Sequence, residues 1–219
     1  MAHHFDLEEQ EQLDQLKHFW NKYGNLITWL LIAVLGGLAA WNGWQYWQRK
    51  SAVEAAALYD ELEKAEQARD TDKVKRVWSD MQAQVPRSAQ AQQGALLAAR
   101  TLLEADQLTE ARDALKFVVD KSSDDGLVAV ARLRLSALDF DAKEYDAALK
   151  WLDAKLPEEF MTLVAERRGD ILLAQGKQDE ARQAYQQSYD AAKEADDHRR
   201  LVEAKLNALG VNPAATDKP

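Results

Sequence analysis

The stretch "AQGKQDEARQAY", Ala174–Tyr185, decides the fold because its pattern occurs a second time in the chain. "FDAKEYDAALKW", Phe140–Trp151, aligns with it position by position and places Ala147 opposite Ala181. Each stretch has a polar break between two segments whose apolar residues recur with the 3.6-residue period of an α-helix. The alignment predicts two copies of a helix–turn–helix unit.

Two further copies extend the pattern toward the N-terminus. They are "EADQLTEARDAL", Glu104–Leu115, and "RDTDKVKRVW", Arg69–Trp78. One anchor position recurs at nearly even intervals in the four copies, and it is occupied by Val74, Ala111, Ala147 and Ala181. Helix–turn–helix units with a period of about 34 residues resemble the tetratricopeptide repeat. A generic alanine-rich helical bundle is the alternative, but composition alone would not keep this period.

The small and large positions of the tetratricopeptide repeat fit two of the copies. They hold Gly169, Leu172, Ala181 and Tyr185 in the fourth copy, and Ala99, Leu102, Ala111 and Leu115 in the second. The first copy has Leu62 and the third has Leu135 at the first small position, so we expect these two copies to be degenerate. The resemblance predicts a helical solenoid over residues 51–209, closed by a helix over residues 196–209. Residues 210–219 are predicted to form a disordered tail.

A tetratricopeptide solenoid binds its partners in a groove lined by the first helix of each repeat. The resemblance implies that the groove residues here are Tyr59, Glu63, Leu96, Arg100, Leu103, Arg132, Ser136, Phe140, Glu166, Asp170 and Leu173. Apolar side chains and charges of both signs suit an extended peptide or a partner helix better than a small anion.

An apolar segment precedes the repeats, "NLITWLLIAVLGGLAAWNGWQYWQRK", Asn25–Lys50. Residues 23–48 contain no charge, and as a helix they would be about 39 Å long, enough to cross a bilayer core of about 30 Å. Trp29 near one end and Trp44 near the other suit the headgroup layers. A cleaved signal peptide is the alternative, but the acidic segment before the span and the aromatic belt after it favour an uncleaved transmembrane helix.

Small residues fall on one face of this span, at Ala33, Gly36, Gly37, Ala40 and Gly43. They would let another membrane helix approach closely, although glycine and alanine are common in membrane helices in any case. Lys17 and Lys22 on one side of the span balance Arg49 and Lys50 on the other, so charge does not predict the orientation.

Charge and composition narrow the possible functions. The chain has a net charge of -9 and no basic patch, which argues against a nucleic-acid partner, and it has no cysteine. Residues 1–22 read as an acidic amphipathic helix, which is either a partner surface or a solvated helix at the membrane interface. His198 is the one histidine after the span, and no motif for catalysis, a cofactor or a metal is present, so we do not expect an enzyme.

The whole layout resembles the YfgM family of Gram-negative bacteria, the ancillary subunit of the SecYEG translocon. The resemblance rests on the acidic start "LEEQEQLDQLKHFWNKYGN", the single span, the exit "GWQYWQ" and the degenerate repeats. It implies an inner-membrane protein with a cytoplasmic N-terminus and a periplasmic repeat domain. The implied partners are the SecYEG translocon, the membrane-tethered chaperone PpiD, exported polypeptides, and a cytoplasmic stress-response regulator at residues 1–22.

Two mechanisms remain open for such a protein. In the first, the groove holds exported chains transiently and helps them to fold. In the second, the repeats form a scaffold that recruits one fixed partner for cell-envelope assembly. Promiscuous, weak peptide binding would favour the first mechanism, and one stoichiometric partner would favour the second.

Overall fold

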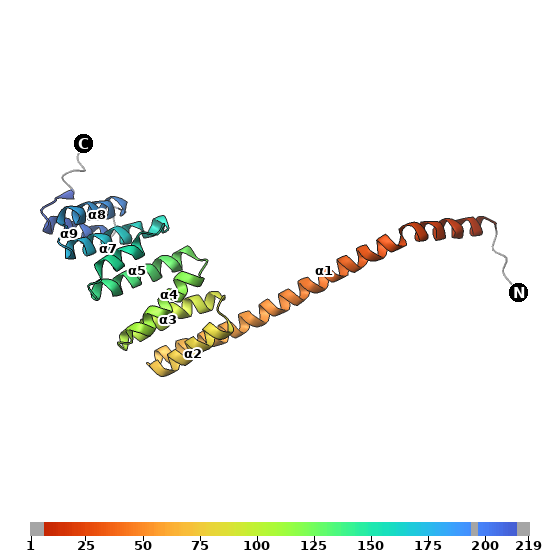
Figure 1. The fold of residues 1–219 in the computed structure, drawn as a ribbon, viewed down its shortest axis with the longest axis horizontal. Helices are drawn as coiled ribbons and strands as arrows, with labels where there is room; N and C mark the ends of the chain where they lie inside the picture. The colour runs from red at the N-terminus through yellow and green to blue at the C-terminus, as the bar shows by residue number, and fades with distance from the viewer. Residues whose placement is uncertain (1–6, 194–196, 214–219) are drawn as a thin grey trace. The chain divides into compact units, whose positions relative to one another are not determined.

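The computed structural model describes residues 7–193 and 197–213, and these residues form helices with no strand (Figure 1). The prediction of an all-α fold is confirmed. The helices are α1 (Leu7–Gln67), α2 (Thr71–Gln84), α3 (Ala89–Glu104), α4 (Leu108–Lys121), α5 (Asp125–Asp141), α6 (Tyr145–Leu152), α7 (Met161–Ala174), α8 (Gln178–Ala191) and α9 (Asp197–Ala208), with a short 3-10 helix, η1 (Glu158–Phe160), before α7.

The chain divides into two compact units, Met1–Val53 and Glu54–Pro219. In the second unit, helices pair in chain order, and each predicted polar break is a turn between two paired helices. The pairs are the end of α1 with α2, α3 with α4, α5 with α6, and α7 with α8, and Figure 1 shows the later helices stacked in the order of the chain. These four pairs are the predicted repeats.

The same backbone turn closes the first helix of every pair. A residue with positive φ follows the helix, and these residues are Arg69 (54°), Asp106 (59°), Lys143 (61°) and Gly176 (79°). The next N–H in each turn donates to the carbonyl five residues earlier, as from Asp70 to Ala65 at 3.0 Å and from Lys177 to Leu172 at 2.9 Å. This pattern is the Schellman motif, which satisfies carbonyls at a helix end that have no partner inside the helix.

These turn residues define the repeat register. The first two intervals between them are equal, and the third, from Lys143 to Gly176, is shorter. Counted from each turn residue, the fifth residue after it is buried in every repeat, namely Val74, Ala111, Ala148 and Ala181. The ninth is also buried in every repeat, namely Trp78, Leu115, Leu152 and Tyr185.

The predicted register of the third repeat was therefore wrong by one residue. Ala148 is the anchor instead of Ala147, and the first small position holds Ser136 instead of Leu135. The prediction kept one constant shift between the third and fourth copies, whereas the turns at Lys143 and Gly176 are one residue closer together than that shift. The third repeat consequently has a small residue where the prediction placed leucine.

Side-chain caps fix where several of the helices begin. The Asp70 carboxylate accepts a hydrogen bond from the Lys73 N–H at 3.0 Å, and the Ser88 hydroxyl accepts one from the Ala91 N–H at 3.0 Å. Each cap satisfies an N–H that the first turn of a helix leaves unpaired.

The core is distributed along the stack of helices. One buried cluster runs from Ala55 in α1 to Leu135 in α5, a second joins α5, α6 and α7, and a third joins α7, α8 and α9. Apolar residues are therefore buried both within each pair and against the neighbouring helices, as expected for a solenoid.

Helices α7 and α8 approach each other closely at one glycine. A Cβ atom on Gly169 would lie 2.5 Å from Cε1 of the Tyr185 ring, a distance that real Cβ atoms do not show. Gly169 is therefore required by the space that the tyrosine occupies, as the repeat pattern predicts.

The C-terminal end is more ordered than the sequence predicts. Helix α9 closes the stack as expected and ends in the same turn, with Gly210 at φ 80° and the Val211 N–H donating to the Leu206 carbonyl at 3.0 Å. Val211 packs against the last core cluster and Pro213 is buried, so the predicted disorder does not begin at Gly210. Residues 214–219, with residues 1–6 and 194–196, lie outside the described part of the chain.

Gly169→Ala should destabilise the repeat unit by about 1–3 kcal/mol, because the added methyl group must displace the Tyr185 ring. In a helix with free space beside the glycine, the same change would raise the stability of the protein by about 0.5–1 kcal/mol. Hydrogen exchange of the α7 and α8 amides in the full chain, held in detergent micelles, measures the change. A double-mutant cycle with Tyr185→Leu is the control, and equal or slower exchange in the single variant would show that the contact does not constrain Gly169.

Lys143→Gly should stabilise the repeat unit by about 0.5–1 kcal/mol, because a side chain in the left-handed region is strained and glycine is not. Gly176→Ala places a Cβ in the same conformation and should destabilise by a similar amount. Urea unfolding followed by tryptophan fluorescence compares the two variants. A shift of both midpoints in the same direction would contradict the common turn geometry.

Candidate interaction surfaces

The predicted groove residues share a position relative to the turns. In the first, second and fourth repeats they lie ten, six or three residues before the turn residue, on a helix face next to the one that packs on the second helix. In the third repeat these positions are occupied by Leu133, Ala137 and Phe140. Phe140 keeps its place, whereas Arg132 and Ser136 lie one residue out of register.

The second repeat places apolar and charged side chains on this face. Leu96 and Leu103 are half-buried against the first core cluster, and Arg100 is exposed and paired with Glu104 at 3.0 Å. The guanidinium of Arg134, on α5, donates to the Leu96 carbonyl at 3.1 Å. Burial, and then the positive charge of Arg100, lowers the pKa of Arg134 from its usual value.

Tyr59 and Glu63 form the start of the same face, on α1. Tyr59 is half-buried against the first core cluster, and Glu63 is exposed. Burial, and then the charge and hydrogen bond of Glu63, raises the pKa of Tyr59. The Tyr59 hydroxyl and the Glu63 carboxylate therefore interact with each other at this edge.

In the fourth repeat, α9 engages the predicted groove residues. The Lys205 ammonium donates to Glu166 and to Asp170, both at 2.6 Å, and His198 Nε2 lies 3.3 Å from Glu166. Glu166 and Asp170 therefore already form ion pairs with the last helix, α9. Of the three predicted groove residues in the fourth repeat, Leu173 is the exposed one.

Tyr185 links this ion-pair cluster to the core. Its ring is buried against Gly169, and its hydroxyl donates to Asp170 at 2.7 Å. Burial raises the pKa of Tyr185 well above its ordinary value, and the hydrogen bond and negative charge of Asp170 raise it further. The phenol is therefore held in its protonated form.

Arg132 and Ser136 lie on the face of α5 that packs toward α6. Ser136 is fully buried and its hydroxyl has no hydrogen-bond partner in the described residues, while the Arg132 guanidinium lies 5.9 Å from the Trp151 ring centre. The full burial of Ser136 contradicts its prediction as a groove residue, which rested on the shifted register, whereas the prediction for Arg132 stays a prediction. The next residue on their face is Asp139, which the sequence prediction did not identify as a site residue.

Asp139 is a carboxylate almost fully buried between helices. It accepts hydrogen bonds from Arg112 on α4 at 2.5 Å and from the indole N–H of Trp151 on α6 at 2.7 Å. The second and fourth repeats have Leu102 and Leu172 at the corresponding position, so a charged residue here is specific to the third repeat.

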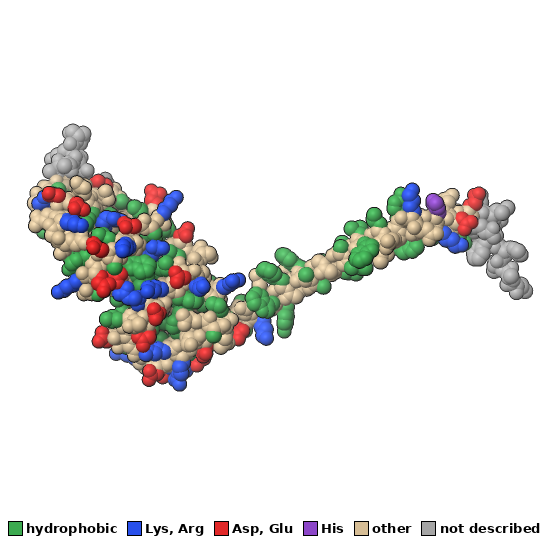
Figure 2. All heavy atoms as spheres, viewed as in Figure 1, with side chains coloured by type: hydrophobic (Ala, Val, Ile, Leu, Met, Phe, Trp, Pro, Cys, Tyr) green, Lys and Arg blue, Asp and Glu red, His purple; other side chains and the backbone are tan. Residues whose placement is uncertain are grey.

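The N-terminal unit exposes many apolar side chains along α1, with charged side chains toward the start of the helix (Figure 2). Helix α1 contains an 18-residue window with a mean hydropathy of 1.7 and is long and apolar enough to cross a membrane. Its large apolar side chains are exposed in the chain, for example Leu30 and Trp44. Nothing lies within 4 Å of the Cβ positions of Gly36, Gly37 and Gly43, so the small face has no partner within the described chain.

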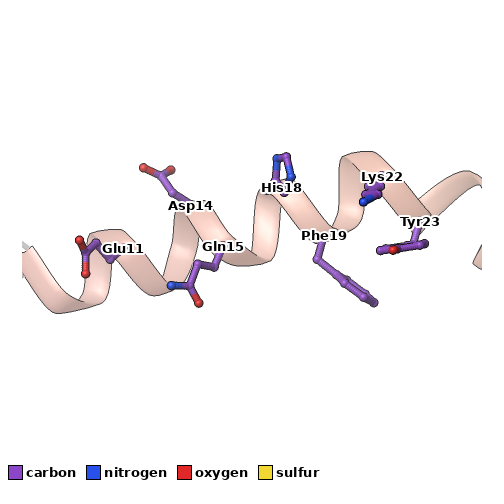
Figure 3. Close-up of a pocket in the computed structure, with 7 residues that line it drawn as sticks. All are labelled: Glu11, Asp14, Gln15, His18, Phe19, Lys22 and Tyr23. Atoms are coloured by element: carbon purple, nitrogen blue, oxygen red, sulfur yellow. The ribbon is translucent and has the colours of Figure 1, made fainter.

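A hollow of about 520 Å³ lies along the start of α1 (Figure 3). All the residues that line it come from this one helix, among them Asp14, His18 and Phe19. A hollow with a single helix for its wall does not surround a ligand, so we do not assign a site to it.

The similarity to known proteins extends over both units of the chain. Residues 17–211 match the family described as tetratricopeptide repeat-like domain. A protein of Neisseria gonorrhoeae named ancillary SecYEG translocon subunit is 34% identical over 214 residues, which cover 95% of this chain and 100% of that protein. Proteins of the same name from Haemophilus influenzae and Escherichia coli are 28% and 29% identical, and the alignments cover 94% and 81% of this chain and 99% and 85% of those proteins.

Tyr185→Phe should lower the free energy of unfolding by about 1–2 kcal/mol at pH 7, because the variant has no hydroxyl to donate a hydrogen bond to the charged Asp170 carboxylate. The wild-type chain should lose stability as the pH rises above about 10, since the unfolded phenol then releases its proton and the folded one keeps it. The variant should lose less over that range.

Urea unfolding of the full chain at pH 7, 9 and 10.5 measures both effects. Tyr145→Phe is the matched control, because the Tyr145 hydroxyl makes no hydrogen bond in the part of the chain that the structure describes. An identical alkaline loss in wild type and Tyr185→Phe would contradict the protonated-phenol assignment.

Proposed function

Since this chain belongs to the YfgM family, the tetratricopeptide repeat-like proteins named ancillary SecYEG translocon subunits, we propose that it acts beside the SecYEG translocon and assists exported polypeptides. The observation that carries this proposal is the match over nearly the whole chain, which includes the apolar helix as well as the repeats. The chain is membrane-anchored through α1.

The proposed ligand of the repeats is an unfolded segment of an exported polypeptide. Apolar side chains at Leu96, Leu103 and Phe140 would take apolar residues of such a segment, and Arg100 would contribute charge. An extended chain is suited to this surface because a solenoid groove is itself extended and repeats its side-chain positions. Engagement of the fourth repeat by α9 limits the length of chain that the groove accepts.

The proposed orientation has residues 1–22 in the cytoplasm and the repeat unit in the periplasm of a Gram-negative cell. It is supported by the resemblance to the family. A PpiD-type membrane-tethered chaperone would then be a neighbour on the periplasmic side, and a stress-response regulator would reach residues 1–22 on the cytoplasmic side. The small face of the span, with Gly36, Gly37 and Ala40, would pack on translocon helices, where close approach favours helix association.

A photo-crosslinking amino acid placed at Leu96, Phe140 or Gly37 of the full chain in intact cells tests this function. The groove positions should yield adducts with many exported proteins, and Gly37 should yield adducts with translocon subunits. Gln187, which is exposed on the second helix of the last pair, is the matched control and should yield few adducts. Mass spectrometry identifies the adducts.

The outcomes separate the two mechanisms. A single abundant adduct at both groove positions would replace the chaperone-like function with a scaffold that holds one fixed partner. Equal adduct patterns at Phe140 and Gln187 would show that the groove face is not a binding surface. Absence of translocon adducts at Gly37 would contradict docking through the small face.

A further inference from the structure

A basic pocket lies between the second and third repeats, on the face of α5 that meets α6. Its volume is about 410 Å³, and α4, α5 and α6 line it. Arg112 and Lys116 come from α4, Arg132 and Asp139 from α5, and Lys150 and Trp151 from α6.

Charge is uneven in this pocket. The Asp139 carboxylate is already engaged by Arg112 and by Trp151. Lys116, Arg132 and Lys150 make no ion pair within the described residues. Glu144 is the other carboxylate that lines the pocket, so positive charge is in excess in a chain whose net charge is -9.

The pocket occupies a place where the other repeats are apolar. The face of the first helix that meets the second helix carries Leu58, Leu62 and Ala65 in the first repeat, Ala95, Ala99 and Leu102 in the second, and Ala165, Gly169 and Leu172 in the fourth. In the third repeat it carries Arg132, Ser136 and Asp139. The Ser136 hydroxyl and the Arg132 Nε are both shielded from solvent without a hydrogen-bond partner in the described residues.

Unpaired polar groups of this kind lower stability, and only the third of the described repeats has a polar stripe on this face. Two features of the pocket indicate which kind of ligand it would bind. Three cations that lack an ion-pair partner among the described residues call for an acidic ligand. The Trp151 indole offers an apolar wall for the methylene groups next to a carboxylate.

We propose that this pocket binds the side-chain carboxylates of an acidic segment of a polypeptide partner. Lys116 on α4, Lys150 on α6 and Arg132 on α5 would contact these carboxylates. The choice of a polypeptide as the bearer of the carboxylates rests on the proposed function, whereas the charge requirement rests on the pocket alone.

Fluorescence anisotropy tests the proposal with the full chain in nanodiscs of zwitterionic phosphatidylcholine. The probe is an amidated octapeptide of alternating alanine and glutamate that carries an uncharged fluorophore. The comparison peptide has glutamine in place of glutamate. The acidic peptide should bind about tenfold more tightly, and its binding should weaken as the salt concentration rises.

The pocket variant is Lys116→Gln with Lys150→Gln, and both lysines are exposed and form no ion pair within the described residues, so the fold should persist. It should lose the preference for the acidic peptide. The control is Lys64→Gln with Lys177→Gln, which removes the same charge from two exposed lysines elsewhere in the repeat unit and should keep the preference. Circular dichroism verifies that both variants are folded.

Equal affinity for the two peptides, or equal loss in the pocket and control variants, would overturn the proposal. Inorganic phosphate that displaces the acidic peptide at equal concentration would identify a general anion site and would also overturn it. Crosslinking at Leu96 and Phe140 tests the groove separately. Pocket selectivity without groove adducts would leave this proposal standing and remove the proposed binding of exported polypeptides in the groove, and groove adducts without pocket selectivity would do the opposite.

Discussion

The four helix pairs depend on one backbone constraint, the left-handed residue that ends each first helix. Its positive φ turns the chain, and the hydrogen bond from the next N–H to the carbonyl five residues earlier fixes how the second helix starts. Because the turn is the same each time, the residues four and seven positions before it always face the second helix. A small residue at the seventh position, such as Gly169, then decides how closely the two helices approach.

This positional rule shows why the third repeat differs from the others. A fully buried hydroxyl without a partner costs about 1–3 kcal/mol, and Ser136 occupies a position that alanine and glycine fill in the second and fourth repeats. Asp139 avoids a larger penalty because Arg112 and Trp151 satisfy its carboxylate. Arg112 belongs to the preceding repeat, so the polar stripe also adds a charged contact between two repeats whose core is apolar.

The sequence was sufficient to predict the helical class, the apolar helix and the four helix pairs, because these follow from local periodicity and polar breaks. It was not sufficient to predict the register of the third repeat, since the interval between turns shortens after Lys143. The pairing of Asp139 with Arg112 joins residues 27 apart, and the ion pair of Lys205 with Glu166 joins residues 39 apart. Such contacts depend on how successive repeats stack, which no single segment encodes.

The surface of the apolar helix suits lipid, whereas the surface of the repeat unit suits water. Apolar side chains cover the charge-free stretch of α1, residues 23–48, and they are exposed in the chain, as at Leu30 and Leu35. A helix with such a surface is stable where lipid replaces water, and its backbone needs no outside partner because its hydrogen bonds lie within the helix. In lipid, burial of apolar area does not favour one neighbouring helix over another. The close approach that the face with Gly36 and Gly37 allows would therefore decide which membrane helix packs against α1. Under the proposed function, the repeats select partners in water by charge and apolar contact together, so the two units would recognise different partners.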